Sequence, residues 1–337
     1  MSDLTIQLLK LINEGKTLNE ISETLNISHK RIFNHLTMIK NSGYDFTRSY
    51  YSSGNIVYSP DVRYNVPSSN EVNLLMSQGD DTLRAVVISD THIGSEKERL
   101  DLLEEVYNYC ISKGIHIIFN CGDLIDNIDN PSKVNREDRV SYLLDNYPFD
   151  KSILNFVVLG NHDISPLKVY GQNLMTMLNN YRHDLVTIGY SEGLVNVKNE
   201  AIVLSHPYID CSLNADKRSK IVFYGHSHFY RIKSFAQQAR YIGVNVPPLC
   251  DIFTMDISYP SILDMELSFN KDSFDRLTLK QLISMYSSFV PVNENVYYFN
   301  GHSNGNSETI TKKELPKTRI LTAGTSQIDK FNAKWNR

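Results

Sequence analysis

The chain has 337 residues, of which 41% are hydrophobic and 21% are charged, a composition that is ordinary for a globular protein. The length favours two domains and is ample for a buried core. The formal net charge of -4 is not typical of a nucleic-acid-binding protein, so any basic surface must be local.

Nothing in the sequence indicates insertion into a membrane or export. No apolar run approaches the roughly 18 residues that a transmembrane helix needs. The first residues lack the basic start and the small-residue cleavage site of a signal peptide. The four cysteines are far apart and form no C-x-x-C motif, which favours reduced thiols (Cys110, Cys121, Cys211 and Cys250). We therefore expect a cytoplasmic protein that has no membrane partner.

Residues 1–66 are predicted to form three helices followed by a β-hairpin. Apolar residues at helical spacing mark a first helix, which ends at Gly15. Thr17 and Glu20 have the spacing of a capping box at the start of a second helix, and Ser28 caps a third. Two aromatic-rich runs around Ser-Ser-Gly-Asn then predict the hairpin. Elements in this order predict a small winged helix-turn-helix domain.

The third helix of this domain has a polar face that is typical of a nucleic-acid-binding helix. Lys30, Arg31 and Asn34, with His29 and His35 beside them, are expected to be exposed and able to reach bases or phosphates. The domain as a whole has seven basic and six acidic residues, a net charge of only +1. The same face therefore also fits a module that contacts another protein.

The rest of the chain divides into three segments. Residues 67–83 are rich in Pro, Ser, Asn and Gly, which predicts a linker. Short apolar strands then alternate with helical patterns over residues 84–300, which is α/β organisation, and the runs 264–270 and 275–282 look like strands of a second sheet. The polar residues 301–337 predict a poorly ordered tail, which could include a terminal helix around Trp335.

Five of the apolar strands end in residues that can bind a metal ion. The first strand, at residues 85–88, runs directly into an Asp-x-His motif, and the other four end in GD, GNHD, HP and GHSH. In an open α/β sheet, ligands bind outside the carboxyl ends of the strands. Five strands that end in this way predict one site that collects seven residues: Asp90, His92, Asp123, Asn161, His206, His226 and His228.

These seven residues offer carboxylate, amide and imidazole ligands, and none offers a thiolate. Such a set suits Mn²⁺, Fe²⁺ or Zn²⁺. Seven ligands are too many for one ion that keeps open positions, so they predict two divalent ions, with Mn²⁺ as our first choice. Glycine precedes three of the ligand groups and would let backbone and metal approach closely (Gly122, Gly160 and Gly225).

The motifs D-x-H, G-D-x-x-D, G-N-H-D, a lone His and G-H-x-H, in this order, resemble those of the calcineurin-like metallophosphoesterases. The resemblance covers roughly residues 84–270. It implies a four-layer α/β sandwich, in which two mixed sheets pack face to face and helices flank them. It also implies two metals bridged by Asp123, one held by Asp90, His92 and His228 and the other by Asn161, His206 and His226.

The same resemblance implies that His162 is not a ligand. It would stabilise the phosphorus centre and protonate the leaving oxygen, and Asp163 would orient it. An imidazole beside metal ions is a competent general acid for an alkoxide. Asp126 either braces this site or caps the next helix, and His116 and His183 are expected to be ordinary structural residues.

Departures from other members of the superfamily bear on the substrate. Serine/threonine phosphatases carry an arginine directly after G-D-x-x-D to clamp a phosphomonoester, and this chain has Asn127 there. Their G-N-H-E motif is followed by an arginine, whereas this chain reads GNHDIS. The motifs look closer to the nuclease branch, such as the SbcD and Mre11 exonucleases and the small subunit of archaeal D-family polymerase. Because a diester lacks the dianion that an arginine clamp holds, a nuclease acting on DNA or another nucleic acid is our first hypothesis.

Two other functions stay open at this stage. The chain could hydrolyse cyclic or small nucleotides while its N-terminal domain only mediates contacts, which the acidic pI of about 6.2 favours. It could instead be a DNA-binding regulator that uses the phosphoesterase fold as a scaffold, although a scaffold has no need for seven ligands. Residues 127–150 look like an insertion that faces the substrate.

Overall fold

The structure is a computed structural model that describes residues 3–41, 45–61, 70–77, 79–207, 219–234, 241–251, 260–285, 288–300 and 309–313. All the predicted site residues lie in these ranges, whereas Cys211 and the region around Trp335 lie outside them. Across the described ranges, no helix is both long and apolar enough to cross a membrane.

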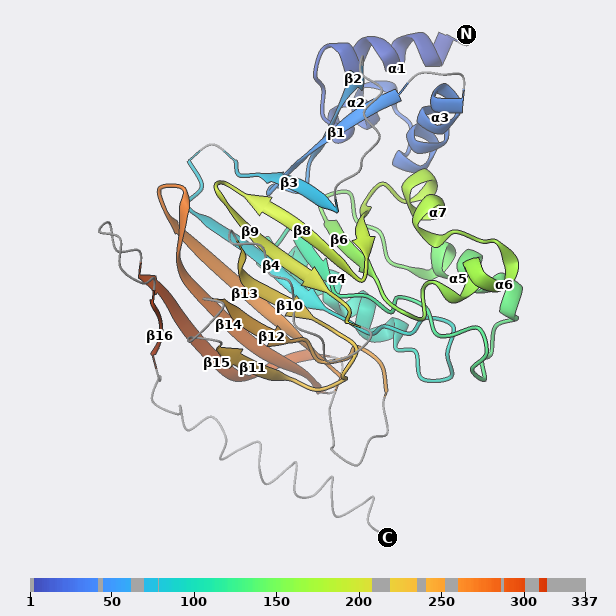
Figure 1. Ribbon diagram of the computed structural model, residues 1–337. Coiled ribbons are helices and arrows are strands. Elements are labelled where there is room, and N and C mark those ends of the chain that lie inside the picture. The colour runs from blue at the N-terminus through green and yellow to red at the C-terminus, as the bar shows by residue number, and fades with distance from the viewer. Residues whose placement is uncertain are drawn as a thin grey trace.

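Two eight-stranded mixed sheets form the body of the protein (Figure 1). The first sheet contains, in spatial order, β16 (Thr309–Lys313), β15 (Ser288–Asn300), β14 (Ser273–Met285), β13 (Ser261–Asn270), β4 (Thr82–Ile88), β5 (Ile117–Asn120), β6 (Leu154–Leu159) and β7 (Leu185–Tyr190). The second contains β11 (Arg231–Ser234), β12 (Ile242–Asn245), β10 (Ser219–Tyr224), β9 (Glu200–Ser205), β8 (Glu192–Val197), β3 (Glu71–Leu75), β1 (Asp45–Tyr51) and β2 (Ile56–Asp61).

The apolar residues of the first sheet are buried on both of its faces. In β4, Ala85 and Val87 belong to the core between the two sheets, whereas Val86 and Ile88 pack with the helices on the other side. Successive strand residues point to opposite faces, so a strand buried on both faces reads as an unbroken apolar run. The helical layer consists of α4 (Leu100–Lys113), the short η1 (Arg136–Asp138), α5 (Arg139–Asn146), α6 (Ser165–Tyr170) and α7 (Leu174–Tyr181).

This arrangement agrees with the predicted α/β class, with two mixed sheets and helices. The described elements form three of the four layers that the resemblance implied, since no described helix lies in the stretch that contains β8 to β12. The assignment of two strands to a second sheet was wrong. The strands at residues 264–270 and 275–282 do not start a second sheet, because β13 pairs antiparallel with β4, with Leu263 opposite Val87.

The N-terminal residues form the expected three helices and hairpin. The helices are α1 (Asp3–Asn13), α2 (Leu18–Leu25) and α3 (His29–Asn41), and the hairpin is β1 and β2. The capping box of Thr17 and Glu20 is confirmed, and the Ser28 hydroxyl accepts a hydrogen bond from the main-chain N–H of Arg31. We call residues 3–61 the N-terminal unit, and its identity as a winged helix-turn-helix stays a prediction.

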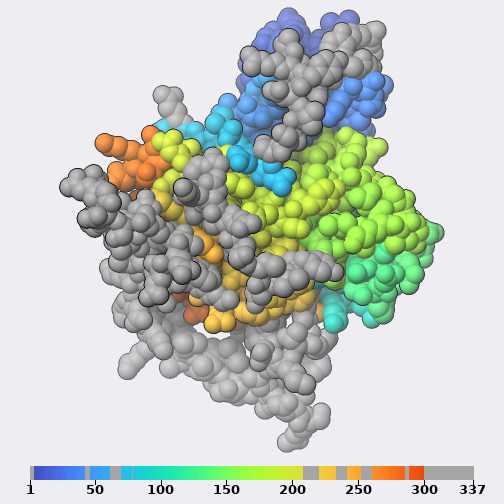
Figure 2. Space-filling model, viewed as in Figure 1, coloured from blue at the N-terminus to red at the C-terminus, as the bar shows by residue number. Residues whose placement is uncertain are grey.

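The N-terminal unit is built into the sandwich. Strand β3 lies within the segment 67–83, which was expected to be a linker, and it pairs parallel with both β1 and β8. The hairpin therefore extends the second sheet, and apolar residues of α1 to α3 belong to the same continuous core as both sheets. Figure 2 shows the unit, in blue, as a lobe that sits directly on the rest of the molecule. The linker prediction failed because only Leu74 of β3 is buried, which leaves little apolar signal.

Part of the predicted tail is also ordered as a strand. Thr309 to Lys313 form β16, which pairs antiparallel with β15, with Phe299 opposite Ile310. The helix considered around Trp335 falls outside the described residues.

Candidate metal centre

The seven predicted ligands lie together, because each follows the carboxyl end of a strand at the same edge of the sandwich. Asp90 and His92 follow β4, Asp123 follows β5 and Asn161 follows β6, all in the first sheet. His206 follows β9 and the pair His226 and His228 follows β10, in the second sheet. The site therefore lies where strands of both sheets end, and the five strand ends converge as predicted.

Five of the seven residues have a left-handed backbone. Their φ angles are positive, between 42° and 76°, a region that residues with a side chain rarely adopt: Asp90, His92, Asp123, His226 and His228. Such conformations cost on the order of 1–3 kcal/mol each and persist where the surrounding structure enforces them, typically at functional sites. Sharp turns of this kind bring the side chains of several strand ends toward one point.

The first cluster consists of Asp90, His92 and His228. The Nε2 atom of His228 lies 3.0 Å from Oδ1 of Asp90 and 3.3 Å from Nε2 of His92, and this last atom is 3.8 Å from the same carboxylate oxygen. Ligands bound at about 2.1 Å to one ion lie roughly 3 Å apart, so the three atoms fit one metal. Burial would raise the pKa of Asp90, but the His228 hydrogen bond and nearby imidazoles hold it well below its usual range.

The second cluster forms around His206, which is fully buried. Its Nε2 atom lies 3.1 Å from Oδ2 of Asp123 and 3.2 Å from Oδ1 of Asn161. Its Nδ1–H donates to the carbonyl oxygen of Cys121 at 2.6 Å, which fixes the ring and directs Nε2 to the site. Burial would lower the pKa of His206, but Asp123 raises it to about 9, so a metal must displace a proton there. A ring nitrogen of His226 lies within 4.8 Å of the ligand atoms of Asp123 and His206.

Asp123 lies between the two clusters. It groups with His206 and His226 on one side and with His92 and His162 on the other. Its Oδ1 accepts the main-chain N–H of His162 at 2.9 Å, and its Oδ2 faces His206. A carboxylate in this place can contact both metals, which is the bridging role that the family resemblance implied.

At the three glycines of the motifs, the backbone lies so close to side chains of the site that no Cβ would fit, which confirms the expected close approach. A Cβ on Gly160 would lie 2.1 Å from Oδ1 of Asp123, and one on Gly122 would lie 2.7 Å from Nδ1 of His206. A Cβ on Gly225 would lie 2.0 Å from the Ser89 hydroxyl and 2.9 Å from Oδ2 of Asp90. In each case a methyl group would displace a side chain of the site. The Ser89 hydroxyl also donates to Oδ2 of Asp90 at 2.5 Å, a support that the sequence reasoning missed.

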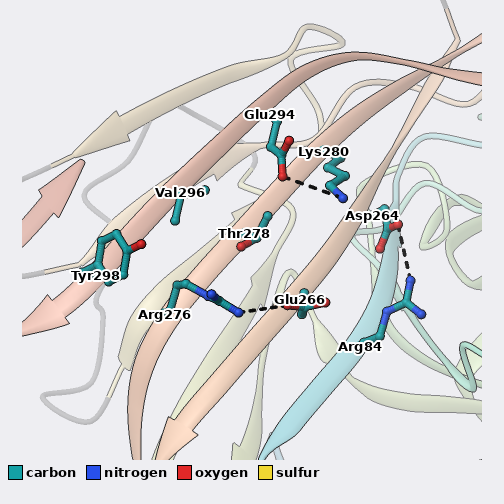
Figure 3. Close-up of a pocket in the computed structure, with 9 residues that line it drawn as sticks. All are labelled: Arg84, Asp264, Glu266, Arg276, Thr278, Lys280, Glu294, Val296 and Tyr298. Carbon is teal, nitrogen blue, oxygen red and sulfur yellow. Dashed lines mark hydrogen bonds and ion pairs between the residues drawn. The ribbon is translucent and has the colours of Figure 1, made fainter. Parts of the chain in front are cut away.

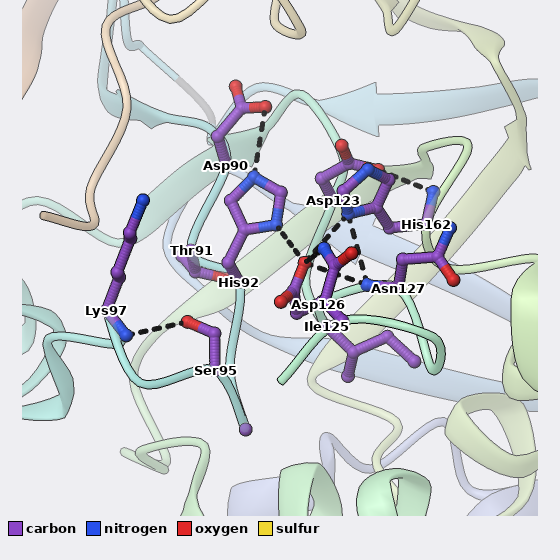
Figure 4. A network of polar contacts seen from close by, with 12 residues as sticks. Asp90, Thr91, His92, Ser95, Lys97, Asp123, Ile125, Asp126, Asn127 and His162 are labelled. Atoms are coloured by element: carbon purple, nitrogen blue, oxygen red, sulfur yellow. Dashed lines mark hydrogen bonds and ion pairs between the residues drawn. The ribbon is translucent and has the colours of Figure 1, made fainter. Parts of the chain in front are cut away.

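His162 is held by Asp126 and not by Asp163. Its Nδ1 atom lies 3.0 Å from Oδ1 of Asp126 and 3.1 Å from the main-chain nitrogen of Asn127 (Figure 4). The same oxygen of Asp126 lies 3.4 Å from Nδ1 of His92. Burial would raise the pKa of Asp126, but its bonds with both imidazoles hold it well below its usual range. Of the two roles considered for Asp126, the contacts support bracing the site.

Asp163 has a different partner set from the one implied by the resemblance. Its carboxylate accepts main-chain N–H groups of Ile125 at 3.0 Å and Gly160 at 2.8 Å. It thereby fastens the loop after β5 to the loop after β6. Burial and the nearby charge of Asp123 raise the pKa of Asp163 to about 6.

The donor set fits divalent metal ions. Buried carboxylates and imidazoles converge without an arginine or lysine among them. Buried charges of this kind are normally paired or bound to metal. The residues that would hold two ions are the seven that the sequence predicted, and their role as ligands stays a prediction.

The predicted nucleic-acid contacts lie far from this centre. Lys30, Arg31 and Asn34 are exposed on α3, as expected. His29 is not exposed: it is buried and its ring packs against Phe149 at 5.7 Å. The helical pattern placed His29 on the polar face, but Phe149 packs against that position.

The two histidines expected to be structural, His116 and His183, have hydrogen-bond partners outside the metal centre. Nδ1 of His183 lies 2.6 Å from the Tyr58 hydroxyl, and Nδ1 of His116 lies 3.0 Å from the carbonyl oxygen of Ser152. The described cysteines are free and buried, as predicted for reduced thiols: Cys110, Cys121 and Cys250.

A cavity of about 330 Å³ lies on the first sheet, away from the metal centre (Figure 3). Three ion pairs cross between neighbouring strands in its wall: Arg84–Asp264 at 3.6 Å, Arg276–Glu266 at 3.1 Å and Lys280–Glu294 at 3.7 Å. Each cation is matched by an acid, which is typical of cross-strand pairs that stabilise a sheet. We assign it no part in the chemistry.

Comparisons with known proteins bear on the family of the chain. The family model described as calcineurin-like phosphoesterase matches residues 83–303. Vps29 of Cryptosporidium parvum is 14% identical, with a TM-score of 0.38 over 69% of this chain and 100% of that one. Yfce, a phosphoesterase from E. coli, is 18% identical (TM-score 0.36; 57% and 96% covered), and the nuclease MPE of Pseudomonas putida is 11% identical (0.29; 68% and 98%).

Likenesses at these scores carry no argument, and no curated protein sequence matches the chain. The family model, by contrast, spans about two thirds of the chain and contains all seven clustered residues and His162. The protein is a metal-dependent hydrolase that acts on ester bonds, and the chain belongs to the calcineurin-like phosphoesterase family.

Proposed function

We propose that this hydrolase is a dinuclear phosphodiesterase that cuts DNA or another nucleic acid. The observation that carries the proposal is the pair of clusters that share Asp123, beside His162 and without an arginine clamp at position 127. When bound, two divalent ions would polarise the phosphoryl group and supply an activated water.

The chain's own residues can account for the departure of the leaving oxygen. His162 lies at the border of the site with its Nδ1 held by Asp126, which leaves its other ring nitrogen to carry a proton toward a leaving alkoxide. The side chain of His162 is 22% exposed, so a substrate can reach it, whereas Asp126 is buried behind it.

The preference for a diester rests on what surrounds position 127. Asn127 occupies the place of the phosphatase arginine, and its main-chain N–H points to His162 and Asp126. The nearby Arg139 directs its guanidinium to main-chain carbonyls. A monoester dianion would lack the bidentate partner that arginine provides, whereas a diester carries only one negative charge.

The choice of nucleic acid rests on the exposed residues Lys30, Arg31 and Asn34 of α3.

A second candidate, a phosphodiesterase of cyclic or small nucleotides, is favoured by a separate observation. The N-terminal unit packs at the ends of the strands that lie opposite the metal centre. A Cβ on Gly54 would lie 2.0 Å from the carbonyl oxygen of Ser152 and 3.2 Å from the Cβ of His116, which precede β6 and β5.

A substrate panel separates the two candidates. Protein loaded with Mn²⁺ is assayed against single-stranded DNA, duplex DNA, RNA, a 3′,5′-cyclic nucleotide, bis-p-nitrophenyl phosphate and the monoester p-nitrophenyl phosphate. Cleavage of a polymer at a higher kcat/KM than any small diester supports the nuclease. Turnover of the cyclic nucleotide alone supports the second candidate, and a clear preference for the monoester would overturn both. Protein treated with EDTA and the Asp123→Ala variant are the controls.

A further inference from the structure

Arg139, the first residue of α5, is a buried cation next to the metal centre. Its side chain is among the largest that are fully buried, with 1% of the residue exposed. Its guanidinium makes no ion pair in the described part of the chain. It donates instead to main-chain carbonyls: to Asn127, to Asp126 at 3.2 Å and to Asn130 at 2.7 Å. Burying an arginine without a carboxylate is costly, so such an arrangement calls for a reason.

The three carbonyls belong to one loop, residues 126–130, which follows the Gly-Asp-x-x-Asp motif. This loop carries Asp126, whose Oδ1 accepts from the Asn127 main-chain N–H at 2.8 Å and from the Asn130 side chain at 2.8 Å. The planar guanidinium therefore holds the backbone of the loop, while the loop's own amides hold the Asp126 carboxylate.

The oxygen held in this way serves two imidazoles. Oδ1 of Asp126 lies 3.0 Å from Nδ1 of His162, the proposed acid, and 3.4 Å from Nδ1 of His92, a proposed ligand (Figure 4). A carboxylate on the far nitrogen of a metal-binding histidine fixes its ring and raises its basicity. The position of the Asp126 carboxylate therefore affects both the acid and the metal site.

We propose that Arg139 is a positioning residue for the reaction, and that it acts through Asp126 on His162. Without the guanidinium, three carbonyls of the loop lose their donor, and the carboxylate loses its fixed place between the imidazoles. Groups that support catalytic or metal-binding residues in this way contribute about 10–100-fold to activity or metal affinity. The inference rests on the proposed role of His162.

A matched control exists in Arg182, which is also buried and also donates to main-chain carbonyls. Its partners are Tyr147 at 2.8 Å and Pro148 at 2.7 Å, and it pairs with Asp184 at 2.7 Å. These residues precede β6 and β7, at the strand ends away from the metal centre. Losing Arg182 should lower stability as losing Arg139 does, but it leaves the loop of Asp126 in place.

The test compares Arg139→Met with Arg182→Met at saturating Mn²⁺, on one diester with an alkoxide leaving group and one with p-nitrophenolate. We expect Arg139→Met to lose about 10–100-fold on the alkoxide ester and clearly less on the p-nitrophenyl ester, which needs little help from an acid. Arg182→Met should change both rates alike. Thermal unfolding and Mn²⁺ stoichiometry are measured in parallel, and Arg139→Met should retain about two ions.

A double-mutant cycle shows whether the effect passes through His162. If it does, Arg139→Met should add no leaving-group selectivity to His162→Ala. If Arg139→Met fails to fold, Asn130→Ala takes its place. Asn130 is exposed, and its substitution removes one hydrogen bond from the Asp126 carboxylate. We expect the same selective loss of activity on the alkoxide ester, but a smaller one.

Equal losses on both esters for Arg139→Met and Asn130→Ala, or a selective loss that persists in the His162→Ala background, would show that Arg139 is only structural. Failure of the parent to turn over either diester is a different outcome, which overturns the proposed function itself.

Discussion

The two ends of the strands β5 and β6 serve different purposes in this molecule. At their carboxyl ends lie Asp123 and Asn161, in loops with tight turns and charged side chains. At their amino ends lie His116 and Ser152, against which Gly54 of the N-terminal unit packs. Strand β6, with six residues, is roughly 20 Å long, so the two regions at its ends are separated by about that distance.

We call the carboxyl ends of these strands, which carry the metal centre, the reactive edge, and the amino ends, which pack against the N-terminal unit, the docking edge. The comparison teaches that one sheet can carry both, built by different kinds of contact. The reactive edge is made from short motifs, each of which brings its own turn. The docking edge joins residues that are far apart in the chain. Tyr58 forms a hydrogen bond with His183, and the ring centroids of Phe33 and His183 lie 4.3 Å apart. Changes at one edge should therefore leave the other largely unaffected.

The largest effect is expected at the residue shared by both metal clusters. Asp123→Ala removes the only carboxylate that groups with both His92 and His206 among the described residues, so both ions should be lost together with hydrolysis. Metal analysis after dialysis against Mn²⁺ should fall from about two ions per chain toward none. Thermal unfolding of the metal-free variant is measured beside it, to show that the variant is folded. A variant that keeps two tightly bound ions would refute the bridging role.

The next effect separates chemistry from metal binding at the same edge. His162→Ala should keep both ions, because His162 is not one of the predicted ligands, and turnover of a diester with an alkoxide leaving group should fall by about 10²–10⁴-fold. The loss should be smaller with p-nitrophenolate, which leaves without protonation. Steady-state kinetics on both esters, with Mn²⁺ stoichiometry beside them, measure this. Parent-like turnover of the alkoxide ester would remove His162 from the mechanism.

At the docking edge the expected effect is on stability. Tyr58→Phe removes a buried hydroxyl that lies 2.6 Å from Nδ1 of His183, which leaves the imidazole nitrogen unsatisfied and should cost about 1–3 kcal/mol of unfolding free energy. Chemical denaturation measures the loss. Hydrolysis of a small diester should not change, and a fall in that rate in the folded variant would show that the two edges are coupled.

The difference between the edges also explains what could be predicted from the sequence. The ligands were predictable because each belongs to a motif of a few residues fixed to a strand end, and Asp90, Asp123 and His206 lie where this reasoning placed them. The partner of His162 was not predictable, because the adjacent residue in a motif need not be the one that contacts it. Asp163 binds main-chain amides, and it is Asp126 that contacts the His162 ring.

Strand pairing and docking were the least predictable features. The sequence pattern indicated the strand β13 but not its pairing with β4, since the two are distant in the chain. The burial of His29 likewise depends on Phe149, which no local pattern connects with α3. Arg139 gave no signal at all, because a charged residue at the start of a helix is normally solvated.

The smallest expected effect concerns the exposed face of α3, and it tests whether the docking edge adds a second binding surface. If Lys30 and Arg31 contact phosphates, Lys30→Ala/Arg31→Ala should weaken DNA binding, and each lost contact should reduce the slope of log K against log salt by about 0.9 on duplex DNA. The full chain is required, because α1 to α3 share their core with the sheets. Hydrolysis of a small diester should stay unchanged, since the metal centre lies at the opposite strand ends.

The control for this experiment removes the same charge elsewhere. Lys10→Ala/Lys113→Ala changes two exposed lysines outside α3, so it matches the change in net charge without touching the proposed face. A reduced slope for the Lys30/Arg31 variant alone locates phosphate contacts on α3. Equal slopes for both variants would mean that only net charge matters. In that case α3 is a surface for another partner, and the phosphodiesterase of small nucleotides becomes the better account, because the metal centre would then act without help from the N-terminal unit.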